Sequence, residues 1–420
     1  MRITDIELHQ VRIPLDPFSS DAINLYHGEI FQVRTIVVLK TDTGLEGLGE
    51  CLSPIDDALL AAVEPLRGTN PCAWLGHTSL LIGVAPAIYD LVGQANEVPA
   101  YSLFGPKIRS YVPFAYWTVS QSPEKMAQEV QRAVQSGYTW MKYHTDSLHN
   151  VIDQTKAMQE VAPPGFKVHY DVNFDNTVDH ILEVAHALAK FPVAGLIEDP
   201  LRTTDFDGHR ILRQKCPLPI IFHHLPLGGR EALLGLADGY MLGHDTVGNA
   251  IRRAGLFEAA NTPFMLQNVG GAITRALILH FSVVFERSTL HHVTAANLWS
   301  DDVVDHPFQV RGGTIQVSDT PGLGVRLNRE RLERWKTGAA TPPPKALLRV
   351  QSTNCGVTIF GRPPRARRDT LRLEAQNIPG LGEGYLNQVA FDTWFDDGSE
   401  RFAALWDRTE RELVVETTGA

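Results

Sequence analysis

Four polar side chains recur at nearly constant spacing along the middle of this chain, each where an apolar run ends. Lys142 lies in YTWMKYH, and Asp171 follows 29 positions later in VHYDVN. Glu198 comes 27 positions after that in AGLIEDP, and His224 comes 26 positions later again in LPIIFHH. A carboxylate at the end of a buried strand is costly unless a positive group faces it. The two carboxylates therefore predict a charged site, and they indicate an enzyme.

The spacing also predicts the elements that position these side chains. One strand and its crossover helix take about 30 residues, so evenly spaced strand ends are typical of a (β/α) barrel with its active site at the C-terminal mouth. Between the first two strands, Ser122 is a candidate helix N-cap, Pro123 the first helical residue and Gly137 the stop. Eight strand-like runs are expected, at 113–119, 138–144, 166–173, 194–199, 218–224, 239–245, 262–268 and 288–294.

Different patterns flank the predicted barrel, which we place at 113–325. Residues 1–112 read as an α+β capping domain with a hairpin around the turn at 41–44 and a long loop at 17–32. Residues 326–345 form a return segment and a proline-rich linker. Residues 346–420 are expected to be a β-rich C-terminal extension, with one of its strand-like runs at 370–375.

Length, charge and cysteine spacing exclude several classes of protein. A chain of 420 residues is too long for one ordinary domain. The net charge of −10 argues against nucleic acid as a partner. The N-terminus lacks the apolar core of a secretory signal, and no apolar run approaches a membrane span. The four cysteines are scattered without metal-site or redox spacing. We therefore predict a cytoplasmic protein that acts on a small molecule without nucleic acid or membrane partners.

Several motifs together make residues 1–335 resemble the enolase superfamily, in its mandelate racemase and muconate-lactonising branch. GLEGLGE is similar to the end of the family's capping hairpin, and residues 87–116 resemble its passage from helix to barrel. HYDVN, LIEDP and DTPGLGV fall where the family has two metal-ligand strands and a late turn. The resemblance implies an α/β fold with an N-terminal α+β capping domain and a modified (β/α)7β TIM-like barrel. We also expect a homo-oligomer.

The resemblance further implies a reaction. Such enzymes abstract the proton α to a carboxylate and stabilise the resulting enediolate on a divalent metal, with a Lys or His as the base. Asp171 and Glu198 match the first two metal ligands, and Lys142 matches the first lysine of a Lys-x-Lys pair. The implied metal is Mg²⁺. The base position holds His144 and the third ligand position holds His224, preceded by His223. A histidine ligand suits Mn²⁺, Fe²⁺ or Zn²⁺ better than Mg²⁺.

Further departures from the family pattern predict the type of reaction. Gly243 takes the place of an aspartate after the sixth strand, and Gln267 takes the place of a histidine after the seventh, so the usual second base is missing. A racemase needs a base on each face of its substrate. A one-base elimination, isomerisation or epimerisation is therefore favoured, most of all dehydration of a small hydroxy acid or acid sugar. The expected substrate-binding residues are Tyr26, His27, Asn173, His223, Asp245, Gln267 and His291.

The sequence leaves three points open. His223 competes with His224 for the third ligand position, and His244, His291 and His292 are alternative bases. A second class of function is also compatible with the departures. In that reading the barrel has lost α-proton chemistry and serves as a binding or scaffold protein.

Overall fold

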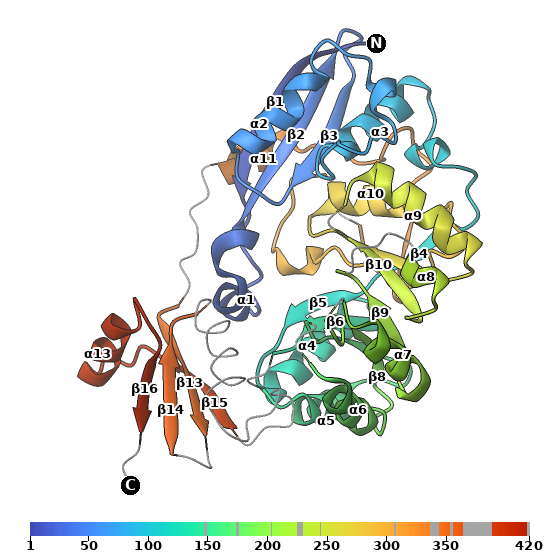
Figure 1. Cartoon of the computed structure of the whole chain (residues 1–420). Helices are drawn as coiled ribbons and strands as arrows, with labels where there is room; N and C mark the ends of the chain where they lie inside the picture. The colour runs from blue at the N-terminus through green and yellow to red at the C-terminus, as the bar shows by residue number, and fades with distance from the viewer. Residues whose placement is uncertain are drawn as a thin grey trace.

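The computed structural model describes residues 1–146, 149–173, 176–202, 204–224, 230–243, 245–305, 308–336, 344–352, 356–363 and 389–417. Its class is mixed α/β, as predicted (Figure 1). None of the helices within these ranges is long and apolar enough to span a membrane.

The N-terminal part is a three-stranded antiparallel sheet with helices against it. β1 (Ile3–Arg12), β2 (Val33–Thr41) and β3 (Glu46–Cys51) lie in the order β1-β2-β3, and the predicted hairpin at 41–44 joins the last two. Gly44 adopts φ 79° in that turn, a conformation that favours glycine. The helical elements are α2 (Asp57–Val63), η2 (Glu64–Leu66), η3 (Pro71–Trp74), α3 (Ala85–Ala95) and η4 (Ala100–Leu103).

The segment predicted as a long loop at 17–32 is instead helical. It forms α1 (Ser20–His27) followed by the 3₁₀ helix η1 (Gly28–Gln32). Ile23 and Asn24 are buried while Asp21 is exposed, so one side of a short helix packs inward. The Ser19 hydroxyl also donates to buried Glu129 of the barrel at 3.2 Å. Tertiary packing thus ordered a segment whose composition alone favoured a loop.

Seven parallel strands form the barrel sheet, in the order β11-β10-β9-β8-β7-β6-β5. The first connecting helix begins as predicted, because Ser122 accepts a hydrogen bond from Lys125 N and Pro123 starts the helix. The strands are β5 (Tyr116–Val119), β6 (Trp140–His144), β7 (Lys167–Asp171), β8 (Ala194–Glu198), β9 (Ile220–Phe222), β10 (Gly239–Gly243) and β11 (Phe264–Gln267). The helices are α4 (Pro123–Gln135), α5 (Val151–Val161), α6 (Val178–Leu188), α7 (Phe206–Lys215), α8 (Arg230–Leu233), α9 (Val247–Ala259) and α10 (Ala272–Ser282).

The expected eighth strand at 288–294 is much shorter than the sequence predicted. It makes only two isolated parallel bridges, His292 with Phe114 and Val293 with Gln267. His292 N donates to Pro113 O at 2.8 Å, and Val293 N donates to Leu266 O at 3.0 Å. These bonds join both edges of the seven-stranded sheet, so the short segment still closes the barrel. The 3₁₀ helix η5 (Ala296–Leu298) follows it, and β4 (Tyr111–Pro113) pairs with β12 (Thr314–Gln316) beside it.

A buried carboxylate joins the capping sheet to the barrel. Glu50, on β3, is 2% exposed and forms an ion pair with buried Arg34 at 2.5 Å. Glu50 also accepts from Gly271 N at 2.9 Å and from Thr274 N at 3.1 Å, at the start of α10. A carboxylate is favourable at a helix N-terminus because it satisfies free N–H groups and the helix dipole. Glu50 therefore fixes the cap over the barrel.

Replacing Glu50 with glutamine should destabilise the protein strongly. The change breaks the buried ion pair of Arg34 and leaves Asp302 as the other carboxylate near its guanidinium. Breaking a buried pair typically costs about 3–5 kcal/mol. Urea unfolding followed by tryptophan fluorescence would measure the loss. Glu46→Gln, in the same hairpin, is the matched control, because the Glu46–Arg329 pair is partly exposed and should contribute at most about 1 kcal/mol. Equal effects of the two changes would contradict this role of Glu50.

The C-terminal part contains a four-stranded antiparallel sheet and an unexpected helix. β13 (Ala346–Ser352), β14 (Val357–Gly361), β15 (Val389–Phe395) and β16 (Val414–Thr417) lie in the order β15-β13-β14-β16. Before them, α11 (Arg329–Lys336) returns to pack on β1. The helix α13 (Glu400–Arg408) begins at the N-cap Ser399 and buries Phe402 and Leu405. The expected strand at 370–375 lies outside the described residues.

Candidate active site

The strand ends bring the predicted polar residues into register at the barrel mouth. Alternate residues of a strand point to the same side, so Lys142 and His144 of β6 share one face, as do His169 and Asp171 of β7. In the sheet, Lys142 pairs with His169, His144 with Asp171, and Asp171 with Glu198 of β8. The parallel register therefore forms two layers, and the deeper one holds Lys142 and His169.

Lys142 is the centre of this cluster. Its Nζ is 2.6 Å from Glu198 Oε2 and 3.1 Å from Asp171 Oδ2. It also donates to Gln267 Oε1 at 2.7 Å, and the side chain is fully buried. Burial opposes the charge, but attraction by Glu198 and Asp171 is stronger, so the pKa of Lys142 is raised. Lys142 is therefore a fixed cation and cannot accept a proton at neutral pH.

Both carboxylates stay ionised beside Lys142. Burial and the mutual repulsion of the two groups act to raise the pKa of Asp171, but Lys142 and His144 outweigh them and the pKa is lowered. Burial likewise disfavours the charged form of Glu198, yet Lys142, His169 and His223 hold its pKa well below the usual range. The site therefore contains two negative charges that face one ammonium group.

His144 is the most accessible of the residues around Lys142. Its side chain is 17% exposed, and its Nε2 lies 3.1 Å from Asp171 Oδ2. With the Nε2 proton directed toward this carboxylate, Nδ1 of a neutral ring is the acceptor. Asp171 thus orients His144 as the carboxylate of a His–Asp pair does.

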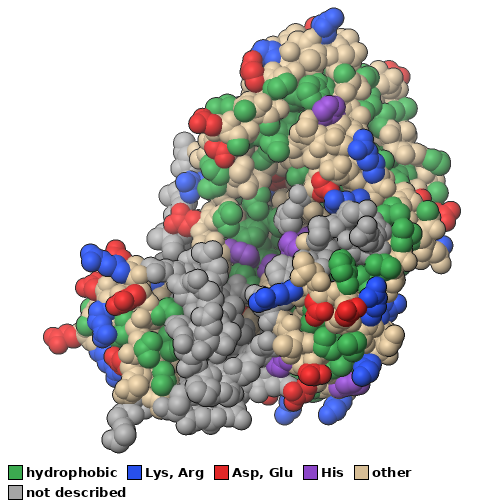
Figure 2. Space-filling view, in the orientation of Figure 1, with side chains coloured by type: hydrophobic (Ala, Val, Ile, Leu, Met, Phe, Trp, Pro, Cys, Tyr) green, Lys and Arg blue, Asp and Glu red, His purple; other side chains and the backbone are tan. Residues whose placement is uncertain are grey.

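Aromatic rings from α1 and β5 surround His144. The ring centroids of Tyr26 and His27 each lie 5.8 Å from that of His144, and the ring of Trp117 lies 5.2 Å away. Figure 2 shows histidine side chains in the hollowed middle of the drawn face. Tyr26 and His27, two of the predicted substrate-binding residues, therefore lie next to the candidate base. Trp117 was not predicted, because its place in an apolar run did not distinguish it from core.

Glu198 is bound by two further histidines. His223 Nδ1 is 2.9 Å from Oε1, and His169 Nε2 is 2.6 Å from Oε2. His169 Nδ1 in turn lies 2.9 Å from His291 Nε2, and the His291 ring stacks on Trp140. Burial lowers the pKa of all three histidines, to about 4 for His223, so they are neutral. They orient Glu198 without cancelling its charge.

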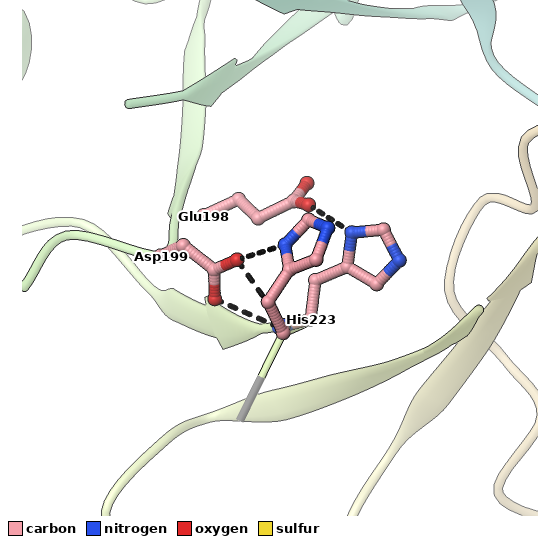
Figure 3. Close-up of side chains that lie close together, drawn as sticks. Glu198, Asp199 and His223 are labelled. Atoms are coloured by element: carbon pink, nitrogen blue, oxygen red, sulfur yellow. Dashed lines mark hydrogen bonds and ion pairs between the residues drawn. The ribbon is translucent and has the colours of Figure 1, made fainter. Parts of the chain in front are cut away.

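Asp199 and His224 complete a group of possible metal ligands. His224 Nδ1 donates to Asp199 Oδ2 at 2.7 Å, and Figure 3 shows Glu198, Asp199 and His223 close together. One ligand atom each from Glu198, Asp199, His223 and His224 lies within 4.8 Å of the others. Both imidazoles donate Nδ1 to a carboxylate, which leaves Nε2 as the nitrogen with the lone pair.

This donor set fits a divalent cation. Two carboxylates and two imidazoles suit Mn²⁺, Fe²⁺ or Zn²⁺ better than Mg²⁺, as the sequence predicted. The charges agree: Asp171 and Glu198 against Lys142 leave a net charge of −1 even before Asp199 is counted. Asp171 lies outside the four-residue group and pairs instead with Lys142 and His144. Its role as a ligand stays a prediction.

Gly243 makes room for His223. A Cβ added at Gly243 would lie 2.3 Å from His223 Nε2 and 2.9 Å from the backbone oxygen of Gln267. An aspartate at this position, as the family resemblance implies, would collide with His223 where that ring now lies.

Gly243→Ala should therefore displace His223 and weaken metal binding. Disturbing a residue that orients or supplies a ligand typically lowers metal affinity about 10- to 100-fold. Calorimetric titration with Mn²⁺ and Zn²⁺ would measure the change. Gly255→Ala, in α9, is the control, because its Cβ meets no atom within 4 Å. If Gly243→Ala keeps wild-type metal affinity, His223 does not depend on this space.

The remaining predicted substrate-binding residues have different surroundings. Asn173 follows β7 with φ 55° and donates to Thr145 O at 3.1 Å. Asp245 pairs with Arg253 of α9 and accepts from Asn249, so it supports the start of that helix. Gln267 accepts from Lys142, and His291 lies in the deeper layer, away from the mouth. The alternative base His244 lies outside the described residues.

Two functional candidates were missed by sequence reasoning. His169 precedes Asp171 by two positions, so strand periodicity alone placed it on the same face. Asp199 directly follows Glu198 and has φ 47°, a left-handed conformation that Asp tolerates better than most residues. Its backbone conformation turns the chain so that Asp199 accepts from His223 N at 2.9 Å, and no sequence pattern signalled this.

Comparison with known sequences identifies relatives. The sequence model of the family described as "Enolase C-terminal domain-like" matches residues 125–331. A cis-3-hydroxy-L-proline dehydratase from Roseibium aggregatum is 26% identical over 363 residues, covering 77% of this chain and 96% of that protein. An arabinonate dehydratase from Saccharolobus solfataricus is 21% identical over 266 residues, covering 60% of this chain and 71% of that protein.

Comparison with solved structures supports the same fold. The dipeptide epimerase from Cytophaga hutchinsonii, solved with Mg and the dipeptide D-Ala-L-Val, superposes with a TM-score of 0.65 at 20% identity. The match covers 80% of this chain and 98% of the epimerase.

Proposed function

Since the chain belongs to the enolase superfamily, in its mandelate racemase and muconate-lactonising branch, we propose that it is a metal-dependent dehydratase of a small hydroxy-carboxylate. Low-identity relatives support a lyase or isomerase of this superfamily. The finer assignment rests chiefly on one observation, the His144–Asp171 pair beside a single fixed lysine.

In this proposal His144 takes the proton α to the substrate carboxylate. Because Asp171 Oδ2 lies 3.1 Å from Nε2, Nδ1 is the nitrogen that would accept the proton, and an imidazole is the commonest general base in enzymes. Lys142 is held by Glu198, Asp171 and Gln267, so it remains protonated and contributes positive charge near the substrate carboxylate. Tyr26 and His27 border the space around His144 and help to exclude water.

We assign the metal to Glu198, Asp199, His223 and His224, with Asp171 kept as a further candidate ligand. When bound, a divalent cation supplies positive charge that stabilises the negative charge developing on the substrate carboxylate. His223 orients Glu198 for that purpose through its hydrogen bond, and His169 Nε2 lies 2.6 Å from the other carboxylate oxygen.

The expected chemistry is one-sided. Gln267, at the end of the seventh strand, cannot accept a proton near neutral pH and already binds Lys142. His144 would take the α-proton and return it to the β-hydroxyl as that group leaves as water, so the reaction needs no second base on the opposite face. Racemisation does need one, which is why dehydration is the preferred assignment.

A panel of hydroxy acids tests this assignment. Purified protein with added Mn²⁺, Mg²⁺ or Zn²⁺ should convert at least one acid to a product lighter by one water, as detected by mass spectrometry. The panel should include arabinonate and cis-3-hydroxy-L-proline, the acids in the relatives' names. Racemisation without loss of water would sink the dehydratase assignment.

One observation favours the alternative of a binding or scaffold protein. The Lys142 ammonium already lies between Asp171 and Glu198, the two positions that match metal ligands of the family. If the purified protein binds none of the three cations with an affinity tighter than about 1 mM, this alternative gains over the enzyme.

A further inference from the structure

A second charged cavity lies on the outside of the barrel, away from the mouth. In a (β/α)8 barrel a helix follows the eighth strand, but here the closing segment is followed only by the three-residue η5. Between α4 and α10 this leaves a cavity of about 570 Å³. Its lining includes Arg132 of α4, Arg275 of α10 and Arg311.

Arg275 is the unusual member of this lining. The residue is 6% exposed, and its guanidinium donates to Thr294 Oγ1 and to Tyr138 OH, each at 3.2 Å. It also lies over the Phe114 ring at 5.5 Å. All three partners are uncharged, and no carboxylate of the described residues forms an ion pair with Arg275. An arginine is always protonated, and a buried charge without a counter-charge is unfavourable.

The other charged residues that line the cavity do not neutralise the positive charge of Arg275. Asp16 is its one acidic lining residue in the part of the chain described, and it already pairs with Arg132 at 2.7 Å. Arg311 is exposed and donates to the neutral Gln309 side chain at 3.2 Å. Three guanidinium groups face one carboxylate, in a protein whose net charge is −10. The cavity is therefore locally positive, although the protein as a whole carries a net negative charge.

We propose that this cavity binds a small organic anion, whose carboxylate or phosphate group pairs with Arg275 and Arg311. The planar guanidinium fork matches such oxyanions. A volume of about 570 Å³ lies within the usual range for pockets that hold small organic molecules. Arg132 and Asp16 border the same space, and Asp16 precedes α1, so the bound anion would contact the anchor of the segment that carries Tyr26 and His27. The site is separate from the catalytic mouth and does not rest on the proposed function.

Calorimetric titration of the full-length protein tests the proposal, with inorganic phosphate, glycerol 3-phosphate and succinate as probes. At least one probe should bind saturably. Arg275→Gln should weaken that binding about tenfold or more, as expected for loss of a charge-assisted hydrogen bond. Preference for the phosphate probes identifies a phosphate ester as the ligand class, and preference for succinate identifies a dicarboxylate.

Three controls locate the binding. Arg311→Gln changes an exposed residue and keeps the test valid if Arg275→Gln does not fold. Arg213→Gln, which breaks a surface pair with Asp238 elsewhere, should leave the affinity unchanged. His144→Asn should also leave it unchanged, which separates this cavity from the mouth. Absence of saturable binding of every probe up to about 10 mM, or binding that Arg275→Gln and Arg311→Gln both leave unaltered, would overturn the proposal.

Discussion

Glu198→Gln is expected to abolish metal binding and to destabilise the fold. Glu198 belongs to the proposed metal ligands and is also a counter-charge of fully buried Lys142. The glutamine side chain is neutral, so Lys142 would keep Asp171 as its remaining ionised partner. Disrupting a buried ion pair in this way typically costs about 3–5 kcal/mol. Metal analysis after dialysis and urea unfolding would measure the two effects separately.

Glu129→Gln is the matched control for this experiment. Glu129 is as fully buried as Glu198, but it accepts from the hydroxyls of Ser19, Tyr116 and Thr118 on the outer side of the barrel. Glu129→Gln should therefore lower stability and leave the metal content unchanged. If the two variants lose metal equally, the loss reflects general unfolding and not a ligand at position 198.

His144→Asn is expected to lower kcat by about 10²-fold or more, the usual contribution of a general base. Asparagine retains a group that can donate to Asp171 but cannot accept a proton at neutral pH. The four-residue metal group does not include His144, so metal affinity should remain at the wild-type value. Steady-state kinetics with the acid identified in the panel, together with calorimetric metal titration, would measure both.

His149→Asn provides a control of similar geometry. His149 lies 3.1 Å from Asp146, as His144 does from Asp171, and the exposure of the two side chains is 19% and 17%. His149 contacts Asp146 and Ser120 and does not belong to the four-residue metal group, so kcat should change little. An unimpaired His144→Asn variant would show that the proton goes elsewhere.

Much of the fold could be predicted because local patterns agreed with tertiary structure. The Ser122 cap, the hairpin at 41–44 and the seven regular strands all rest on short-range signals. The predictions that were wrong depended on distant partners. α1 is ordered by burial of Ile23 and by the Ser19–Glu129 bond, and the closing segment at 288–294 is limited to two bridges by its neighbours on either side.

The sequence predicted which residues lie in the site better than it predicted the contacts between them. Spacing placed Lys142, Asp171 and Glu198 at adjacent strand ends, but it could not show that Lys142 bridges the two carboxylates. Side-chain direction after a strand depends on backbone conformation, and the positive φ of Asp199 brought an unpredicted carboxylate beside His224. The close approach of His223 to Gly243 likewise depends on tertiary structure and could not be predicted from the sequence.

Loss of label from an α-deuterated substrate tests the central claim most directly. Each enantiomer of the acid identified in the panel would be incubated with the protein in water, with and without the divalent cation. We expect deuterium to pass to solvent from one enantiomer only when the cation is present, and we expect His144→Asn to slow this loss about 10²-fold. Product that retains its α-deuterium, or loss of label from both enantiomers at similar rates, would contradict one-sided proton abstraction by His144.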